Sequence, residues 1–539
     1  MDELKKHSPA DSSHPWRGRA AWFVIIGLAL LAFWPALNSG FAGDDWGFLA
    51  LSRHLDWPWA LYYYDHSSSY FYRPHTMLLW WLSVAALGLH PTAHMALNLG
   101  LHTINALLLA QIIVRTTRHE RLGMAIGALF ALHPAAVGTA LWLSDRFDLL
   151  ATAAVLWAVL GMEGALAGTA KRRWVVAAAV LAAGAKETAV VLPLIAAARL
   201  LLARERSWRW RSATLAGVSM PFALMLLVRA TLLQGVSTTL DIHDAPDAAL
   251  RGIRNWIAGA PDALIAARVA NSTDIVLAGL LAGCVGWWLL RSSRRTVGTS
   301  ALAILGVTCM LAPALVQWPV TQAVLGTPQP FVNPVNLRFY YLSLSGLLML
   351  TAAAVATLED RRILAVLTVA ALAASIVWLP ASRVRAANWA AETSGPEYRV
   401  ALAAGRLAAH LQVEPGCRLH LLGTMELSHG FFRFADAAVK AQSPRGTPLL
   451  ECIVMAEHSP WFSITRQMPC EDAVWQPLTP RSKSGQVYTA HPVGNLCYHY
   501  FADPAPRTTS VEPASRWFQF DGDNFREITN TAKEVRQPG

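Results

Sequence analysis

The stretch AAWFVIIGLALLAFWPALNSGFAGDDWGFLA, residues 20–50, joins a long apolar run to two adjacent acids, Asp44 and Asp45. A helix of about 20 apolar residues is long enough to cross the hydrocarbon core of a bilayer. The residues after this run do not look like a signal-peptidase cleavage site, so we expect an uncleaved first span over residues 20–39. The two acids then stand where the chain leaves the membrane.

Apolar runs of this kind recur along the chain and define its class. The protein has 539 residues, of which 54% are hydrophobic and 15% are charged. This composition indicates an integral-membrane protein and argues against a large soluble one. The net charge of +10 comes from basic loops beside the apolar runs, which report topology and lipid contact more often than nucleic-acid binding. We therefore expect a membrane lipid among the partners and no nucleic acid.

Clusters of Lys and Arg separate the apolar runs and set the orientation of the chain. Basic loops stay on the cytoplasmic side, so all six clusters are placed there. The clusters are Lys5 to Arg19, Arg115 to Arg121, Lys171 to Arg173, Arg204 to Arg211, Arg291 to Arg295, and Arg361 with Arg362. This choice requires residues 73–88, with Trp80 and Trp81, to lie as a helix in the outer interface.

The predicted fold is a polytopic α-helical membrane protein with a soluble α/β domain outside the membrane. About eleven helices are expected to cross, over residues 20–39, 91–114, 122–143, 148–167, 174–186, 188–204, 212–231, 273–290, 297–317, 339–358 and 363–380. The orientation puts residues 1–19 in the cytoplasm as a tail and residues 20–380 in a bacterial-type inner (plasma) membrane. Two long outer loops, 40–90 and 232–272, interrupt this transmembrane domain.

Residues 381–539 have a different pattern and are predicted to form the periplasmic or extracellular domain. One helical segment is followed by several short apolar segments with strand periodicity. Four cysteines of this region lie where oxidation is feasible, and two disulfides of undetermined pairing are expected among them. They are Cys417, Cys452, Cys470 and Cys497.

Charged residues at the outer ends of the predicted spans form the candidate site. Besides Asp44 and Asp45, they are Asp145, Arg146, Asp148, Lys186, Glu187 and Arg338. One acid of the pair can take the proton from an attacking hydroxyl, and the other can orient the acceptor or bind a divalent metal, Mg²⁺ or Mn²⁺. Arg338, Arg146 and Lys186 are suited to hold a phosphate. The alternative for each charge is an interfacial anchor or ion pair, and for the acid pair a helix cap.

Histidines are the second group of candidates, and we favour structural roles for them. His133 precedes Pro134 inside the predicted span 122–143, where a structural hydrogen bond is the preferred interpretation. A polar stripe with helical spacing, made of His94, Asn98, His102 and Asn105, is more typical of hydrogen bonds between helices than of metal ligation.

The order of these segments resembles the GT-C superfamily of integral-membrane glycosyltransferases. Within it, the resemblance is to the protein O-mannosyltransferase branch, including the transmembrane O-mannosyltransferases that carry TPR repeats, and it covers roughly residues 20–380. It rests on the acid pair, on YRP at 72–74, HP at 133–134, R-x-D at 146–148, KE at 186–187 and R-x-Y-Y-L at 338–342. This sequence departs from the family in lacking the usual His and Glu after HP, in having RPH for RPL, and in having no TPR array after residue 380.

The resemblance implies a role for each matched residue. Asp44 and Asp45 correspond to the acidic motif that supplies the catalytic carboxylate, and Arg338 with Tyr341 to the element near the donor's lipid phosphate. Arg146, Lys186 and Arg73 are expected to bind this phosphate together with Arg338. Supporting positions are Asp148, Glu187, His133 and Tyr341. The predicted reaction moves a sugar, with inversion, from a polyprenyl-phosphate donor to a hydroxyl of a glycan, lipid or protein on the outer face.

Two other function classes remain open. A transporter or flippase of lipid-linked saccharides should place its charges near the middle of the bilayer, often with broken spans. A non-catalytic scaffold of the cell envelope should tolerate the loss of both Asp44 and Asp45.

Overall fold

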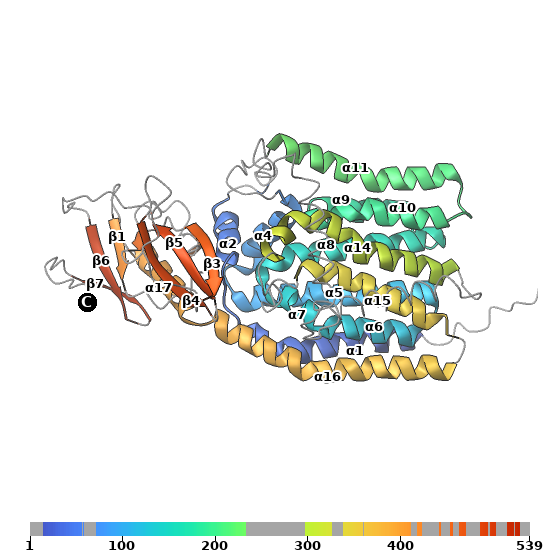
Figure 1. Ribbon diagram of the computed structural model, residues 1–539, viewed down its shortest axis with the longest axis horizontal. Helices are drawn as coiled ribbons and strands as arrows, with labels where there is room; N and C mark the ends of the chain where they lie inside the picture. The colour runs from blue at the N-terminus through green and yellow to red at the C-terminus, as the bar shows by residue number, and fades with distance from the viewer. Residues whose placement is uncertain are drawn as a thin grey trace, which may run out of the picture. The chain divides into compact units, whose positions relative to one another are not determined.

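The computed structural model (Figure 1) places helices and strands in two compact units. The first unit comprises Met1–Asn38, Pro58–Leu79 and Pro91–Ala390, and the second comprises Ser39–Trp57, Trp80–His90 and Ala391–Gly539. The residues described are 15–55, 58, 72–232, 297–325, 338–358, 361–410, 418–422, 441–442, 453–455, 463–469, 486–493, 496–502, 515–521 and 523–528.

The first unit is a helical bundle. Its elements are α1 (Pro15–Phe33), η1 (Trp34–Asn38), the start of α4 (Pro74–Leu87), α5 (Pro91–Thr117), α6 (Glu120–Leu132), α7 (Pro134–Leu141), η3 (Leu143–Asp145), α8 (Arg146–Leu166), α9 (Arg172–Ala183), η4 (Glu187–Val191), α10 (Leu192–Leu202), α11 (Trp208–Leu232), α14 (Val297–Leu325), α15 (Tyr341–Ala356) and most of α16 (Arg361–Thr393). Helix α8 packs between α5 and α9, and α14 packs along α15. Figure 1 shows α8, α9, α10 and α11 side by side.

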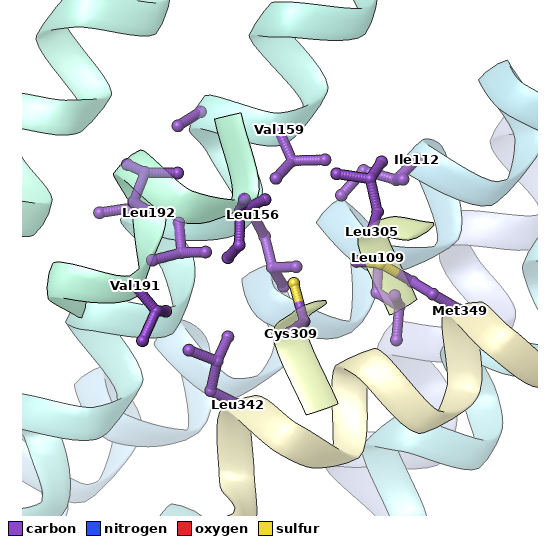
Figure 2. Packing of buried hydrophobic residues seen from close by; sticks show 14 of the residues in the cluster. Leu109, Ile112, Leu156, Val159, Val191, Leu192, Leu305, Cys309, Leu342 and Met349 are labelled. Atoms are coloured by element: carbon purple, nitrogen blue, oxygen red, sulfur yellow. The ribbon is translucent and has the colours of Figure 1, made fainter. Parts of the chain in front are cut away.

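The interior of this bundle is closely packed and apolar. Figure 2 shows Leu109 of α5, Leu156 of α8, Cys309 of α14 and Met349 of α15 meeting in it, and each of these side chains is completely buried. Helices α14 and α15 approach closely because glycines face each other, and a Cβ built on Gly306 would lie 2.8 Å from the carbonyl oxygen of Gly346. Small residues at helix contacts are typical of membrane bundles, where backbones pack directly against one another.

Five helical segments in the described ranges are long and apolar enough to cross a membrane. They are Pro91–Thr117, Leu143–Leu166, Trp208–Thr231, Arg338–Ala356 and Ala365–Leu407. Helices α9 and α10 have only 12 and 11 residues, and shorter apolar helices cover Trp22–Asn38, Pro74–Leu87 and Gly298–Pro313. Residues 273–290 and almost all of loop 232–272 lie outside the described part. The structure thus supports a multi-pass membrane protein, and eleven crossing helices stay a prediction.

The span predicted over 122–143 contains a sharp bend, and its crossing of the membrane stays a prediction. Helices α6 and α7 are bent by 62° at their junction, so this pair is either one broken span or a re-entrant loop. Pro134 has no N–H and its ring excludes a straight continuation of the helix, which explains why the break falls there. His133 ends α6 and begins α7, because its ring Nδ1 accepts a hydrogen bond of 3.1 Å from the Ala135 N–H.

The second unit combines helices with two sheets. Its helices are α2 (Asp45–His54), the end of α4, and α17 (Pro396–His410). Its described strands are β1 (Arg418–Leu422), β2 (Ile453–Met455), β3 (Ser463–Pro469), β4 (Gln486–Val493), β5 (Leu496–Ala502), β6 (Ser515–Phe520) and β7 (Phe525–Ile528). One sheet has the order β2-β1-β6-β7, in which β1 is parallel to both of its neighbours, and the other is antiparallel with the order β3-β5-β4.

The described part of residues 381–539 contains both helix and strand, and a soluble α/β domain outside the membrane stays a prediction. The second unit also takes in residues 39–57 and 80–90, which the sequence assigned to an outer loop of the transmembrane domain. Cys417, Cys452 and Cys470 lie outside the described residues, so the two expected disulfides stay a prediction.

Candidate functional site

The two adjacent acids lie in a tight turn of the second unit, here called the acid turn (residues 42–45). Gly43 has φ +55°, a left-handed conformation that favours glycine, and it reverses the chain just before α2. The Asp45 side chain accepts a hydrogen bond of 3.0 Å from the Ala42 N–H, and the Asp45 N–H donates to the Ala42 carbonyl at 3.1 Å. Asp44 occupies the N-cap position of α2, although its side chain makes no capping hydrogen bond.

The acid turn gives its two carboxylates different surroundings. Asp45 is 1% exposed and closes the turn, whereas Asp44 is partly exposed. The start of α2 is fixed by Trp46, which stacks on Tyr398 at a ring distance of 6.0 Å and meets Phe41 edge-on at 5.3 Å. Of the two predicted catalytic acids, Asp44 is therefore the better placed to reach a substrate.

Most of the other predicted residues come together in the first unit, in what we call the charge cluster. Lys186 pairs with Asp148, and Glu187 accepts from both Arg73 at 2.7 Å and Arg229 at 2.8 Å. Arg338 lies 3.7 Å from Asp145. The Lys186 ammonium also interacts electrostatically with Asp145, Arg73 and Arg338, which ties the pairs into one group. The charge cluster thus contains Arg73, Asp145, Asp148, Lys186, Glu187, Arg229 and Arg338.

The start of α4 is anchored on the turn after α9, which brings Arg73 to Glu187. The His75 N–H donates to the Gly184 carbonyl at 2.9 Å, and the Thr76 hydroxyl donates to the Ala185 carbonyl at 3.0 Å. The His75 ring occupies the space beside Gly184 where a side chain would point. His75, which stands where the family pattern has Leu, therefore has a packing role, because its ring fits against Gly184 of the neighbouring turn.

Arg146 lies in the interior of the bundle, and phosphate binding by this residue stays a prediction. It is completely buried, and its Nε donates to Asn98 Oδ1 at 2.8 Å while an Nη donates to the His94 carbonyl at 3.3 Å. Asn98 in turn donates to the Trp142 carbonyl at 3.1 Å. These contacts fix Arg146 between α5 and the start of α8, as part of the bundle.

Tyr341 is also buried, and it joins α15 to α5. Its hydroxyl lies 2.7 Å from His102 Nδ1 and accepts from the Asn105 amide at 3.2 Å. The other ring nitrogen of His102 lies 2.9 Å from the Ala131 carbonyl. The prediction that the polar stripe of α5 makes hydrogen bonds between helices is confirmed. Tyr341 thus holds α15 against α5 at a point three residues after Arg338.

His133 lies outside the charge cluster as well. Besides capping α7, its ring meets Trp378 of α16 edge-on at a distance of 4.9 Å. The structural interpretation preferred for this histidine agrees with these contacts.

The charge cluster is biased towards binding an anion. Its four cations and three carboxylates leave one net positive charge. Burial would raise the pKa of Glu187, but the charges of Arg73 and Arg229 outweigh it and lower that pKa to about 2. The Arg338 guanidinium stacks over the Trp142 ring at 4.6 Å and the Phe339 ring at 5.0 Å, and its side chain is 23% exposed. Arg338 is thus held in place by aromatic faces and is only loosely paired with Asp145.

Arg229 was missed by the sequence analysis, although it bonds directly to Glu187. The signal was present, because Arg229 is a single basic residue at the outer end of the predicted span 212–231. A charged residue at the end of a membrane span is a candidate functional residue, because burying a charge near the bilayer is costly.

A metal site is not evident in the described part of the chain, where no group of three or more His, Cys, Asp or Glu side chains is arranged to hold an ion. The Asp45 carboxylate is engaged by the Ala42 N–H, and each acid of the charge cluster lies beside a cation. Binding of Mg²⁺ or Mn²⁺ by Asp44 or Asp45 stays a prediction.

Comparison with known proteins gives weak structural likeness only. No family model and no curated protein matches the chain. The oligosaccharyltransferase of Archaeoglobus fulgidus, solved with a tethered acceptor peptide, is similar with a TM-score of 0.44 and 11% identity over 81% of this chain and 64% of that one. ArnT of Cupriavidus metallidurans is similar with a TM-score of 0.39 and 13% identity when bound to undecaprenyl phosphate, over 88% of this chain and 97% of that one. Its apo form gives 0.34 and 16%, over 80% and 85%.

The chain spans less than two thirds of the length of the archaeal oligosaccharyltransferase. Likeness at these TM-scores assigns neither a family nor an activity, so the functional argument rests on the residues of this chain.

Proposed function

We propose that this protein is a membrane glycosyltransferase that moves a sugar from a polyprenyl-phosphate carrier to a hydroxyl acceptor on the outer face of the membrane. The observation that carries the proposal is the charge cluster, which has a net positive charge and a partly exposed, loosely paired arginine. An anion with a lipid tail is the ligand expected for such a group at the end of a membrane bundle. The order of the matched motifs, from the acid pair to R-x-Y-Y-L, points to the same chemistry.

In this proposal Arg338 binds the donor phosphate. A guanidinium presents parallel N–H donors that match two phosphate oxygens, and the Trp142 and Phe339 rings hold it in one orientation. Lys186 and Arg73 are held by Asp148 and Glu187, and they add positive charge near the phosphate. Positive charge fixed in advance stabilises the negative charge that develops on the leaving phosphate.

Asp44 is proposed as the general base. The acceptor oxygen attacks the anomeric carbon of the sugar, and the bond from that carbon to the carrier's phosphate oxygen breaks. The bonding pair leaves with the phosphate, and the hydroxyl proton passes to the Asp44 carboxylate. Attack from the face opposite the leaving group inverts the anomeric configuration. Asp45 keeps the acid turn closed through its bond with Ala42 and so positions Asp44.

The proposal is tested by replacing each acid of the turn. Asp44→Asn is expected to lower transfer by about 10²- to 10⁴-fold, the usual contribution of a general base. Asp45→Asn keeps an oxygen that can accept the Ala42 N–H and should retain more activity. The assay adds a panel of undecaprenyl-phosphate sugars to membranes that carry the protein, and measures both released undecaprenyl phosphate and labelled product. Glu205→Gln, at an exposed acid outside the site, is the matched control. Full turnover by Asp44→Asn would exclude the assignment.

A transporter of lipid-linked saccharide is the second candidate, because of the 62° break between α6 and α7. Broken helices form substrate sites in many transporters. The same assay separates the two functions, since a transporter moves the donor intact and releases no undecaprenyl phosphate. A non-catalytic scaffold would also release none, and it would tolerate both substitutions in the acid turn.

A further inference from the structure

The charge cluster lies at the N-terminal end of α8, and a second group of basic residues lies at its C-terminal end. This second group is here called the basic end. It is formed where α8 and α10 end and where α9 and α11 begin. Residues 167–174 and 203–212 contain seven basic residues and one acid, Glu205. The basic residues are Lys171, Arg172, Arg173, Arg204, Arg206, Arg209 and Arg211.

The two loops of the basic end lie against the same helix terminus. Arg206, from the loop after α10, donates to the carbonyls of Ala165 at 3.0 Å and Leu166 at 2.7 Å, at the end of α8. The loop that continues from Leu166 leads directly to Lys171. Arginine bonded to the last carbonyls of a helix satisfies acceptors that have no partner within the helix. Arg206 therefore explains how the loops are joined, and the neighbouring cations belong to two of the basic clusters predicted to face the cytoplasm.

The remaining cations are exposed and lack acidic partners. Lys171, Arg172, Arg173, Arg204 and Arg209 are all exposed. Within the described part of the chain, none of these five is paired with a carboxylate. This contrasts with the charge cluster, where every cation has an acid beside it.

Four helix termini meet at the basic end, and their dipoles act on the cations in opposite directions. Helices α9 and α11 begin here, and neither has an acidic residue in its first turn. The first turn of α9 includes Arg172 and Arg173, and that of α11 includes Arg209 and Arg211. Cations are unfavourable at these two helix starts and favourable at the ends of α8 and α10, so the helix dipoles alone do not explain why the cations gather here.

Tryptophans are interleaved with these cations. Trp174 is 47% exposed and Trp208 is 69% exposed. The guanidinium of Arg173 lies 5.4 Å from the Trp174 ring centre, and that of Arg211 lies 5.7 Å from the Trp208 ring centre. Exposed Trp beside Arg is typical of the level of lipid headgroups, where the ring meets the acyl boundary and the cation meets phosphate.

We propose that the basic end is a docking surface for the headgroup of an anionic phospholipid, with phosphatidylglycerol as the test ligand. A lipid fits better than a soluble anion because large apolar side chains are exposed beside the cations, including Leu201 at 69% and Trp208. The surface is separate from the proposed active site. Leu166 lies 18 positions after Asp148 along α8, which is about 27 Å at 1.5 Å per residue. The inference therefore stands or falls independently of the glycosyltransferase proposal.

The test uses the full chain purified in a neutral detergent and titrated with a fluorescent phosphatidylglycerol. The variant Arg172→Gln/Arg209→Gln is expected to weaken binding by on the order of 10-fold, since each basic residue near an anionic lipid surface contributes substantially to attraction. The control Arg383→Gln/Arg399→Gln removes two exposed arginines elsewhere and should bind like the wild type. Phosphatidylcholine has the same phosphate with a neutral headgroup and should bind much more weakly. Equal melting temperatures of the variants establish that folding is unaffected, because only exposed side chains change.

Three results would overturn the inference. The first is equal binding of phosphatidylglycerol by the wild type and Arg172→Gln/Arg209→Gln. The second is equal affinity of the wild type for phosphatidylcholine and phosphatidylglycerol. The third is displacement of phosphatidylglycerol by millimolar inorganic phosphate, which would show that the cations bind any phosphate and that the apolar side chains add nothing.

Discussion

The two ends of α8 use the same basic side chains in different ways. At the N-terminal end, Arg73 and Lys186 are mostly buried and each bonds to a carboxylate. At the C-terminal end, Arg172 and Arg209 are exposed, and no carboxylate among the described residues is paired with them. A paired, buried cation has a fixed position and a reduced net charge, which suits a site that must orient one small group. Unpaired, exposed cations keep their full charge and mobility, which suits attraction to a surface.

The largest effect is expected for a buried pair that lies near the basic end but belongs to neither surface. Arg199 bonds to Glu163 through two nitrogens, at 2.5 and 3.0 Å, with side chains only 5% and 10% exposed. Arg199→Leu leaves the Glu163 carboxylate buried without its cation and should destabilise the protein by about 3–5 kcal/mol. Thermal unfolding in detergent measures this loss.

The double variant Glu163→Leu/Arg199→Leu is the control for that prediction. Replacing both partners by apolar residues removes the unpaired charge, so most of the lost stability should return. A double variant as unstable as Arg199→Leu would show that packing, and not charge burial, sets the effect.

The next largest effect is expected at the charge cluster. Lys186→Met should lower the rate of sugar transfer by on the order of 100-fold. The lost interaction is a hydrogen bond from a charged group to the donor phosphate, and such bonds contribute about 1.5–3 kcal/mol each. Initial rates of undecaprenyl phosphate release measure the change. Since Asp148 would be left buried, Asp148→Asn/Lys186→Met is assayed in parallel, and it should be stable yet equally slow. Recovery of activity in this double variant would mean that Lys186 serves only to neutralise Asp148.

A smaller change is expected when Arg338 keeps its charge but loses its planar group. Arg338→Lys should weaken donor binding by about 10-fold. An ammonium cannot donate two parallel hydrogen bonds to two phosphate oxygens, and it stacks less well than a guanidinium on the Trp142 ring. The KM for donor should rise, and the KM for acceptor should be unchanged. The reverse pattern would move Arg338 from the donor to the acceptor.

The smallest effect is a dependence of stability on acid pH. The pKa of Glu187 is lowered to about 2 from an ordinary value of 4.5, so the folded state binds this proton less readily than the unfolded state. The stabilisation is fully present above pH 4.5 and is lost as the pH falls towards 2. Melting temperatures of Glu187→Gln should therefore vary less with pH over this range than those of the wild type. Parallel curves for the two proteins would contradict the assignment.

Much of the bundle could be predicted from the sequence because apolar length and basic loops reflect the bilayer directly. The helices over 91–117 and 208–232 follow the predicted spans closely, and the polar stripe with His102 and Asn105 does make hydrogen bonds between helices. The ion pair between Arg73 and Glu187 was not predicted, since these residues are far apart in the chain and the motifs give no pairing.

Other features depend on three-dimensional contacts that periodicity does not encode. The bend at Pro134 was hidden by an unbroken apolar run, in which a proline is compatible with either a kink or a break. The burial of Arg146 depends on Asn98, which lies on another helix. Asp45 is buried and bonded to the Ala42 N–H whereas Asp44 is partly exposed, and two adjacent acids look equivalent in a sequence.

Binding of undecaprenyl phosphate to the purified full chain tests the central claim most directly. The measurement compares the wild type with Arg338→Ala and, as a control at an exposed arginine outside both the charge cluster and the basic end, Arg383→Ala. The account predicts that Arg338→Ala weakens binding by about 10-fold or more, and that Arg383→Ala leaves the affinity unchanged. Equal affinities for the wild type and Arg338→Ala, or a loss caused only by Arg383→Ala, would contradict it.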